Sequence, residues 1–191
     1  MSCLGYKGGI GTASRRSPTG HTVGALLLSN FGGRDRLTVD GVPVGRLLAL
    51  EEDAERQHDG RSPPRPPAGS CIVVLITDAP LDGAACTRLA RRAGLGLART
   101  GSTGDHGSGE IFLALATGLR SDREKPAHEN ARQVSGVALD PLFAAAVEAT
   151  EEAVLNSMLA AETVTGRDGN VSRRLPVDRV LELLSVAGRR D

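Results

Sequence analysis

The run GSCIVVLITDAPL, residues 69–81, determines the architecture of this 191-residue sequence. Residues 71–77 are its most apolar and β-branched part, which is typical of a central strand buried on both faces. The Asp-Ala-Pro triplet at 78–80 ends the strand, and residues 81–99 carry apolar and basic side chains at helical spacing. The sequence therefore predicts a buried strand followed by a helix.

Downstream, the same pattern is repeated. A glycine-rich loop at 100–110 leads into a second apolar run at 111–117, which predicts another buried strand. An Asp-Pro pair, suited to an N-cap and the first helical position, opens an Ala-rich helix expected over 140–162. A final amphipathic helix is expected over 176–187.

Upstream, residues 21–29 predict a buried strand that ends in a turn at Asn30, and residues 37–44 predict a short β segment. The stretch 51–67 is charged and Pro-rich, so we expect an exposed linker over 51–69. The chain is long enough for one domain, expected over 1–191. Strands and helices in these numbers predict an α/β or α+β fold, with helices covering a sheet.

Composition excludes several classes of protein. Lys plus Arg (23) equals Asp plus Glu (23), so no basic excess indicates a nucleic-acid partner. The three cysteines, Cys3, Cys71 and Cys86, have no C-x-x-C spacing, so neither a disulfide framework nor a metal site is expected. No apolar run approaches the roughly 18 residues of a membrane span, and the N-terminus lacks a signal-peptide core. A reduced, cytoplasmic location is expected.

One candidate for chemistry is the junction Gly69-Ser70, between the expected linker and the expected strand. The Ser70 hydroxyl could attack the Gly69 carbonyl in an N-to-O acyl shift, and hydrolysis of the ester would free an α-amine at Ser70. That amine has a reference pKa of about 7.7–8.0 and could activate its own hydroxyl. A serine that simply begins a strand explains the same residues, and spacing alone favours that explanation.

Two further candidates flank this junction in the sequence. Ser108 and Glu110 are two residues apart, so on a strand end they would point the same way, and a carboxylate can orient a serine. Asn30 could donate a hydrogen bond to an oxyanion. A polar loop and a turn asparagine are the simpler explanations of these residues taken alone.

Taken in order, however, six segments resemble the P1 family of peptidases, peptidase family S58, which contains L-aminopeptidase/D-amidase-esterases and β-peptidyl aminopeptidases. The matching segments are KGGIGTASR (7–15), TVGALLLSNFG (22–32), DGVPVG (40–45), GSCIVVLITDAPL (69–81), RLARRAGLGLARTGS (88–102) and GSGEIFLALAT (107–117). Family members carry a long segment before the first of these, so the resemblance indicates an N-terminally truncated member.

The resemblance implies a four-layer αββα sandwich, here without its N-terminal part, and a homo-oligomer that needs no cofactor. It implies that Ser70 is the nucleophile, exposed by self-cleavage after Gly69. Ser108 and Glu110 match the serine and carboxylate that assist the nucleophile, and Asn30 matches the asparagine that stabilises the oxyanion. The family's catalytic tyrosine belongs to the absent segment, and Tyr6 lies too close to the first matching segment to replace it.

The implied function is a serine aminopeptidase or amidase that releases N-terminal residues from small peptides or amino-acid amides. Two alternatives remain open at this point. The chain could act on non-peptide amides, such as nylon oligomers or pantetheine-like compounds, although relatives of that branch use threonine as the nucleophile. Alternatively, it could be an inactive remnant or subunit, because much of the substrate pocket belongs to the absent segment.

Overall fold

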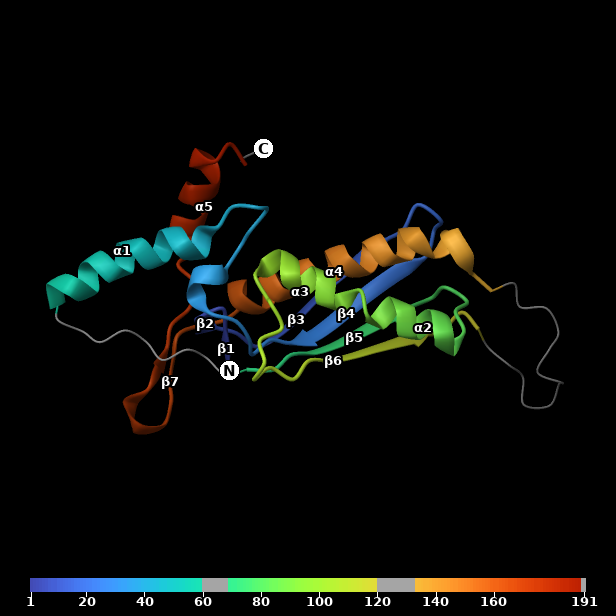
Figure 1. Ribbon diagram of the computed structural model, residues 1–191, viewed down its shortest axis with the longest axis horizontal. Coiled ribbons are helices and arrows are strands. Elements are labelled where there is room, and N and C mark those ends of the chain that lie inside the picture. The colour runs from blue at the N-terminus through green and yellow to red at the C-terminus, as the bar shows by residue number, and fades with distance from the viewer. Residues whose placement is uncertain (60–68, 120–132, 190–191) are drawn as a thin grey trace.

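A four-stranded mixed sheet is the centre of the computed structural model, which describes residues 1–59, 69–119 and 133–189 (Figure 1). The strands lie in the order β3 (Ile10–Arg16), β4 (Thr22–Leu28), β5 (Ile72–Thr77) and β6 (Ile111–Ala116). Strand β4 is antiparallel to both of its neighbours, β3 and β5, whereas β5 and β6 are parallel. The expected α+β class is confirmed, and the three apolar runs that predicted strands form β4, β5 and β6.

Strand β3 was not predicted, because its glycines and arginines hide its pattern. It pairs with all of β4 from Ile10 opposite Leu28 onward. Gly11 has a specific role here: a Cβ atom at this position would lie 1.9 Å from the carbonyl oxygen of Ala153. The glycine therefore lets helix α4 (Asp140–Leu159) pack directly on the strand backbone.

Three helices cover one face of the sheet (Figure 1). They are α2 (Gly83–Ala90), α3 (Ala93–Thr100) and α4. The single helix expected over 81–99 is thus two helices, separated at Arg91 and Arg92, and α2 begins at an Asp82 side chain that accepts a hydrogen bond from the Ala85 amide at 2.7 Å. The expected helix over 140–162 is α4, and Asp140 lies inside its first turn, not at the N-cap.

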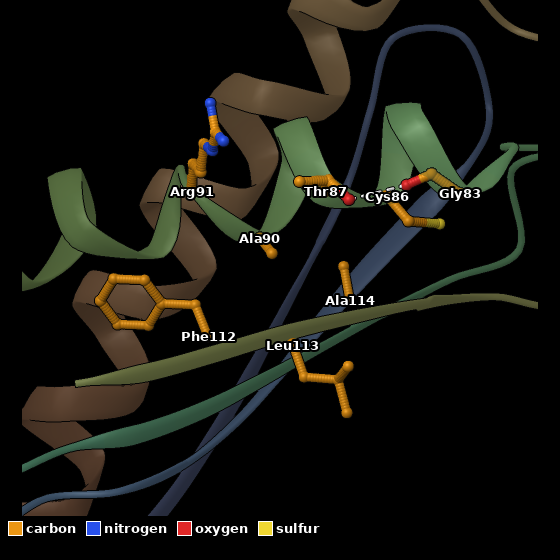
Figure 2. Close-up of a pocket in the computed structure, with 8 residues that line it drawn as sticks. All are labelled: Gly83, Cys86, Thr87, Ala90, Arg91, Phe112, Leu113 and Ala114. Atoms are coloured by element: carbon orange, nitrogen blue, oxygen red, sulfur yellow. Dashed lines mark hydrogen bonds between the residues drawn. The ribbon is translucent and has the colours of Figure 1, made fainter. Parts of the chain in front are cut away.

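The opposite face of the sheet is open in the part of the chain that the structure describes, so the prediction of strands buried on both faces was wrong. In β5, Leu75 is fully buried, whereas Ile72 and Ile76 are 41% and 44% exposed. Figure 2 shows the same alternation in the edge strand β6, where Ala114 points toward α2 and Leu113 points away. Apolar side chains occupy the open face across the sheet: Ile10, Leu26, Ile72, Ile76, Ile111, Leu113 and Leu115.

This open apolar face has a simple physical meaning. Side chains two apart on a strand share a face, and only one face of this sheet has a helical layer within the described residues. A contiguous exposed apolar patch of this kind marks a surface that another element covers. The described residues therefore supply two layers, one sheet and one set of helices, of the four that the resemblance implies.

Residues 37–44 do not form the predicted β segment. They contain only an isolated bridge between Val39 and Val42, and helix α1 (Val44–Asp59) begins directly after Pro43. Proline has no amide hydrogen for a strand ladder but fits before a helix, where its carbonyl accepts from the Arg46 amide at 3.1 Å. Helix α1 includes residues 51–59 of the expected linker, whereas residues 60–68 lie outside the described part of the chain.

Helix α1 lies with α5 (Val177–Val186) and the hairpin of β7 (Val164–Thr165) and β8 (Val171–Ser172) beyond one end of the sheet (Figure 1). Arg179 of α5 pairs with Glu51 of α1 and with Glu182. The remaining short elements are β1 (Ser2–Cys3), β2 (Tyr6–Lys7) and the 3-10 turns Arg34–Arg36, Gly136–Leu139 and Arg167–Gly169. Among the helices in the described ranges, none has the length and apolarity needed to span a bilayer.

Candidate active site

The register of three strands brings the candidate residues to one edge of the sheet. Leu28 of β4 lies opposite Ile72 of β5, and Ile72 lies opposite Ile111 of β6. Asn30 leaves this edge just after β4, Ser70 enters it just before β5, and Glu110 directly precedes β6. Because β5 and β6 are parallel, their N-terminal ends meet at the same edge.

The backbone at Gly69 lies directly against Asn30. A Cβ atom at residue 69 would be 2.0 Å from the carbonyl oxygen of Asn30 and 3.0 Å from the Cα of Phe31. Only glycine allows backbones to approach so closely. The peptide bond that we expect to be cleaved is therefore held beside the asparagine that we expect to stabilise the oxyanion.

Ser70 is exposed to solvent. It lies next to the loop that carries the other two candidates, since a Cβ atom at Gly109 would be 3.6 Å from Ser70 Oγ. Within that loop the Ser108 hydroxyl donates a short hydrogen bond to Glu110 Oε1. The amide of Ile111 donates to the carbonyl of Cys71 at 2.9 Å, which joins the two strand entrances.

The Asn30 side chain is fixed by a contact that sequence patterns did not reveal. The backbone amide of Ser2 donates to Asn30 Oδ1 at 3.0 Å, an assignment that leaves both Nδ2 hydrogens for other partners. Beside it, the buried Ser29 hydroxyl bonds Ser157 Oγ of α4 at 2.7 Å and both the amide and the carbonyl of Gly9 at 3.1 Å. These contacts join segments far apart in sequence. Apart from the position of Ser29 next to Asn30, nothing in the local sequence indicated them.

Electrostatics around the site favour neutral thiols. Burial, with smaller contributions from the nearby Cys3 and Glu110, raises the pKa of Cys71, the residue after Ser70, to about 12. Burial likewise raises the pKa of Cys3 to about 12 against a smaller opposing effect of its hydrogen bond to Ser29. Neither thiol is a thiolate near neutral pH, so neither competes with Ser70 as a nucleophile.

Neither Tyr6 nor a metal ion has a place in this arrangement of described residues. Tyr6 is buried, with the guanidinium carbon of Arg34 at 4.8 Å from its ring centroid, which is a packing position. In the described residues, no cluster of three or more His, Cys, Asp or Glu side chains could hold a metal ion.

A cavity of about 420 Å³ lies between α2 and β6 (Figure 2). Its wall contains none of the candidate catalytic residues. The lining residues are Gly83, Cys86, Thr87, Ala90, Arg91, Phe112, Leu113 and Ala114. The candidate site is therefore at the sheet edge and separate from this groove.

Comparison with known proteins agrees with the family resemblance of the sequence. The model of peptidase family S58 matches residues 1–172. β-Peptidyl aminopeptidase BapA of Sphingosinicella microcystinivorans is 40% identical over 197 residues, covering 92% of this chain and 47% of that protein.

Solved structures agree with the sequence comparison. A Burkholderia sp. β-aminopeptidase is similar with a TM-score of 0.80 and 39% identity, over 100% of this chain and 52% of that chain. An L-aminopeptidase D-Ala-esterase/amidase from Ochrobactrum anthropi, described as a variant of the Ntn hydrolase fold, gives a TM-score of 0.80 and 35% identity, over 99% and 51%. The chain thus spans about half the length of the relatives it matches.

Proposed function

The chain belongs to peptidase family S58, and we therefore propose that it is the nucleophile-bearing part of a serine aminopeptidase that cleaves itself between Gly69 and Ser70. The observation that carries this proposal is the meeting of Asn30, Gly69-Ser70 and the Ser108–Glu110 pair at one sheet edge. These residues are distant in sequence, so a serine that merely begins a strand would not require this arrangement.

Self-cleavage begins when Ser70 Oγ attacks the carbonyl carbon of Gly69 and its proton passes toward the Ser108–Glu110 pair. The resulting oxyanion accepts a hydrogen bond from Asn30 Nδ2. The C–N bond then breaks, the nitrogen takes up a proton, and an ester links Gly69 to Ser70 Oγ. Water hydrolyses this ester, leaving a carboxylate on Gly69 and a free α-amine on Ser70.

The mature nucleophile then turns over substrate with the same groups. The α-amine of Ser70 accepts the proton from its own hydroxyl, as in other N-terminal nucleophiles, because an amine of this kind is partly unprotonated near neutral pH. Ser70 Oγ attacks the scissile carbonyl, the amine product leaves with a proton, and water releases the acyl group. Ser108 and Glu110 orient the nucleophile, and Asn30 again stabilises the oxyanion.

We propose small peptides or amino-acid amides as substrates, acted on at the N-terminus. The names of the relatives support this choice, since they are a β-peptidyl aminopeptidase and an L-aminopeptidase D-Ala-esterase/amidase. A panel that includes peptide, amino-acid amide and non-peptide amide substrates distinguishes this proposal from the alternative amidase.

Turnover of a substrate, we propose, also needs the length of chain that the relatives have and this sequence does not. The open apolar face of the sheet supports this view, because water-exposed isoleucine and leucine across several strands call for a covering layer. We further propose a homo-oligomeric, cytoplasmic protein, in keeping with its three free cysteines.

Self-cleavage, in contrast, uses only residues of this chain, so the purified chain can test it. Intact mass after a long incubation should show two pieces, residues 1–69 and 70–191, while Ser70→Ala stays whole. A single wild-type species of 19.8 kDa would instead support the inactive remnant.

A further inference from the structure

The loop that presents Ser108 and Glu110 has little intrinsic order. It spans residues 101–110 and contains four glycines, and most of its length from Thr103 to Gly107 is exposed. Glycines give a chain large conformational freedom, and ordering it costs about 1–2 kcal/mol of backbone entropy per residue. A loop of this kind needs an anchor if it is to hold a catalytic pair in one place.

Arg36 is that anchor in the structure. Its Nη1 donates to Thr103 Oγ1 at 2.6 Å and to both carboxylate oxygens of Asp105 at 2.8 Å. The Thr103 hydroxyl donates to Asp105 Oδ1 at 2.9 Å, which closes the cluster. Asp105 in turn is hydrogen-bonded to the Ser108–Glu110 pair, because its backbone carbonyl accepts a hydrogen bond from the Ser108 amide at 2.8 Å.

The backbone of Arg36 is itself held against the start of the same loop. A Cβ atom at Gly101, where φ is +114°, would lie 2.0 Å from the Arg36 carbonyl oxygen. The Thr38 amide donates to the Thr100 carbonyl at 3.0 Å. Arg36 also ends the 3-10 turn that follows Asn30. The segment that carries Asn30 and the loop that carries Ser108 are therefore joined by one arginine.

The charges of this contact are stable at neutral pH. The Arg36 guanidinium, with help from Thr103, holds the pKa of the Asp105 carboxyl below its usual value, and Asp105 raises the pKa of Arg36. Both side chains are partly exposed, and exposed pairs contribute little to global stability. The contact is thus suited to fixing a loop, not to holding the fold together.

We propose that Arg36 and Asp105 are positioning residues that hold the Ser108–Glu110 pair in register with Ser70 during self-cleavage and turnover. This inference rests on the proposed function. Neither residue touches the reacting atoms, and both act through the backbone of the loop. A misplacement of about 1 Å can cost about 10²-fold in rate, so even partial loosening of the loop is measurable.

The test measures the rate of self-cleavage by intact mass in purified full chains. Arg36→Ala and Asp105→Ala should each slow cleavage roughly 10-fold or more, with a melting temperature close to that of the wild type. Arg36→Lys should restore part of the rate. The double variant should be no slower than either single variant, because both remove one contact.

The matched control is Arg179→Ala, which breaks another exposed arginine–carboxylate contact, that with Glu51 and Glu182, in helices that carry none of the candidate catalytic residues. It should cleave at the wild-type rate. If the wild type cleaves itself and both Arg36→Ala and Asp105→Ala cleave at the same rate, this inference is overturned but the proposed function is not. Fully additive losses of rate in the double variant would have the same meaning. A wild-type chain that never cleaves would overturn the proposed function itself.

Discussion

Replacing Gly69 with alanine should block the proposed self-cleavage almost completely. The new Cβ atom would lie 2.0 Å from the carbonyl oxygen of Asn30, whereas ordinary contacts begin at about 3.4 Å. The two backbones must therefore separate by about 1.4 Å, which moves the carbonyl of residue 69 away from the side-chain amide of Asn30. A shift of about 1 Å costs about 10²-fold in rate, or about 2.7 kcal/mol in activation free energy.

The assay follows the fraction of cleaved chain with time by mass spectrometry, with circular dichroism as a check that the variant is folded. Gly83→Ala is the control, because a Cβ atom there meets nothing within 4 Å and the position lies at the start of α2, away from the site. It should cleave like the wild type. Equal rates for Gly69→Ala and the wild type would refute the close approach of Gly69 to Asn30 as a requirement for cleavage.

Other predictions address the oxyanion, the core and the thiols. Asn30→Ala should slow self-cleavage about 10²–10³-fold, measured by the same time course, because it removes one oxyanion donor. Leu75→Ala, at a fully buried position under the helices, should lower the free energy of unfolding by about 2–5 kcal/mol in urea titrations. Iodoacetamide should modify the half-buried Cys86 of the native protein before the buried Cys3 and Cys71, as peptide mapping would show. Burial raises the pKa of those two thiols from 9.0 to about 12, so the unfolded chain loses these protons at lower pH than the folded chain. The free energy of unfolding should therefore be unaffected below pH 9 and fall as pH rises toward 12. Urea unfolding midpoints measured at pH 8 and pH 10 check the sign of this change.

The apolar runs predicted the strands but not their environment. Ile72 and Ile76 are as apolar as Val73 and Leu75, so the sequence of β5 has no polar alternation to show that one face is open. That face depends on which layers are present, which is a property of the whole assembly and not of the strand. Helix α1 escaped prediction for the opposite reason, since its charged residues resemble those of a linker.

The candidate site residues were proposed from motifs, whereas their arrangement required the fold. Asn30, Ser70 and Glu110 meet because β4, β5 and β6 share one register, which no local pattern specifies. The groups that hold them, such as the Ser2 amide and the Arg36 guanidinium, come from distant segments with unremarkable sequences. Contacts of this kind are set by tertiary packing, so sequence periodicity carries no signal for them.

N-terminal sequencing of the purified, incubated chain examines the proposed chemistry most directly. We expect a second N-terminus that reads Ser-Cys-Ile-Val-Val, beginning at Ser70, and its absence from Ser70→Ala. If only Met-Ser-Cys-Leu is found, or if the Ser70→Ala chain is cut at the same bond, then Ser70 is not a self-activating nucleophile.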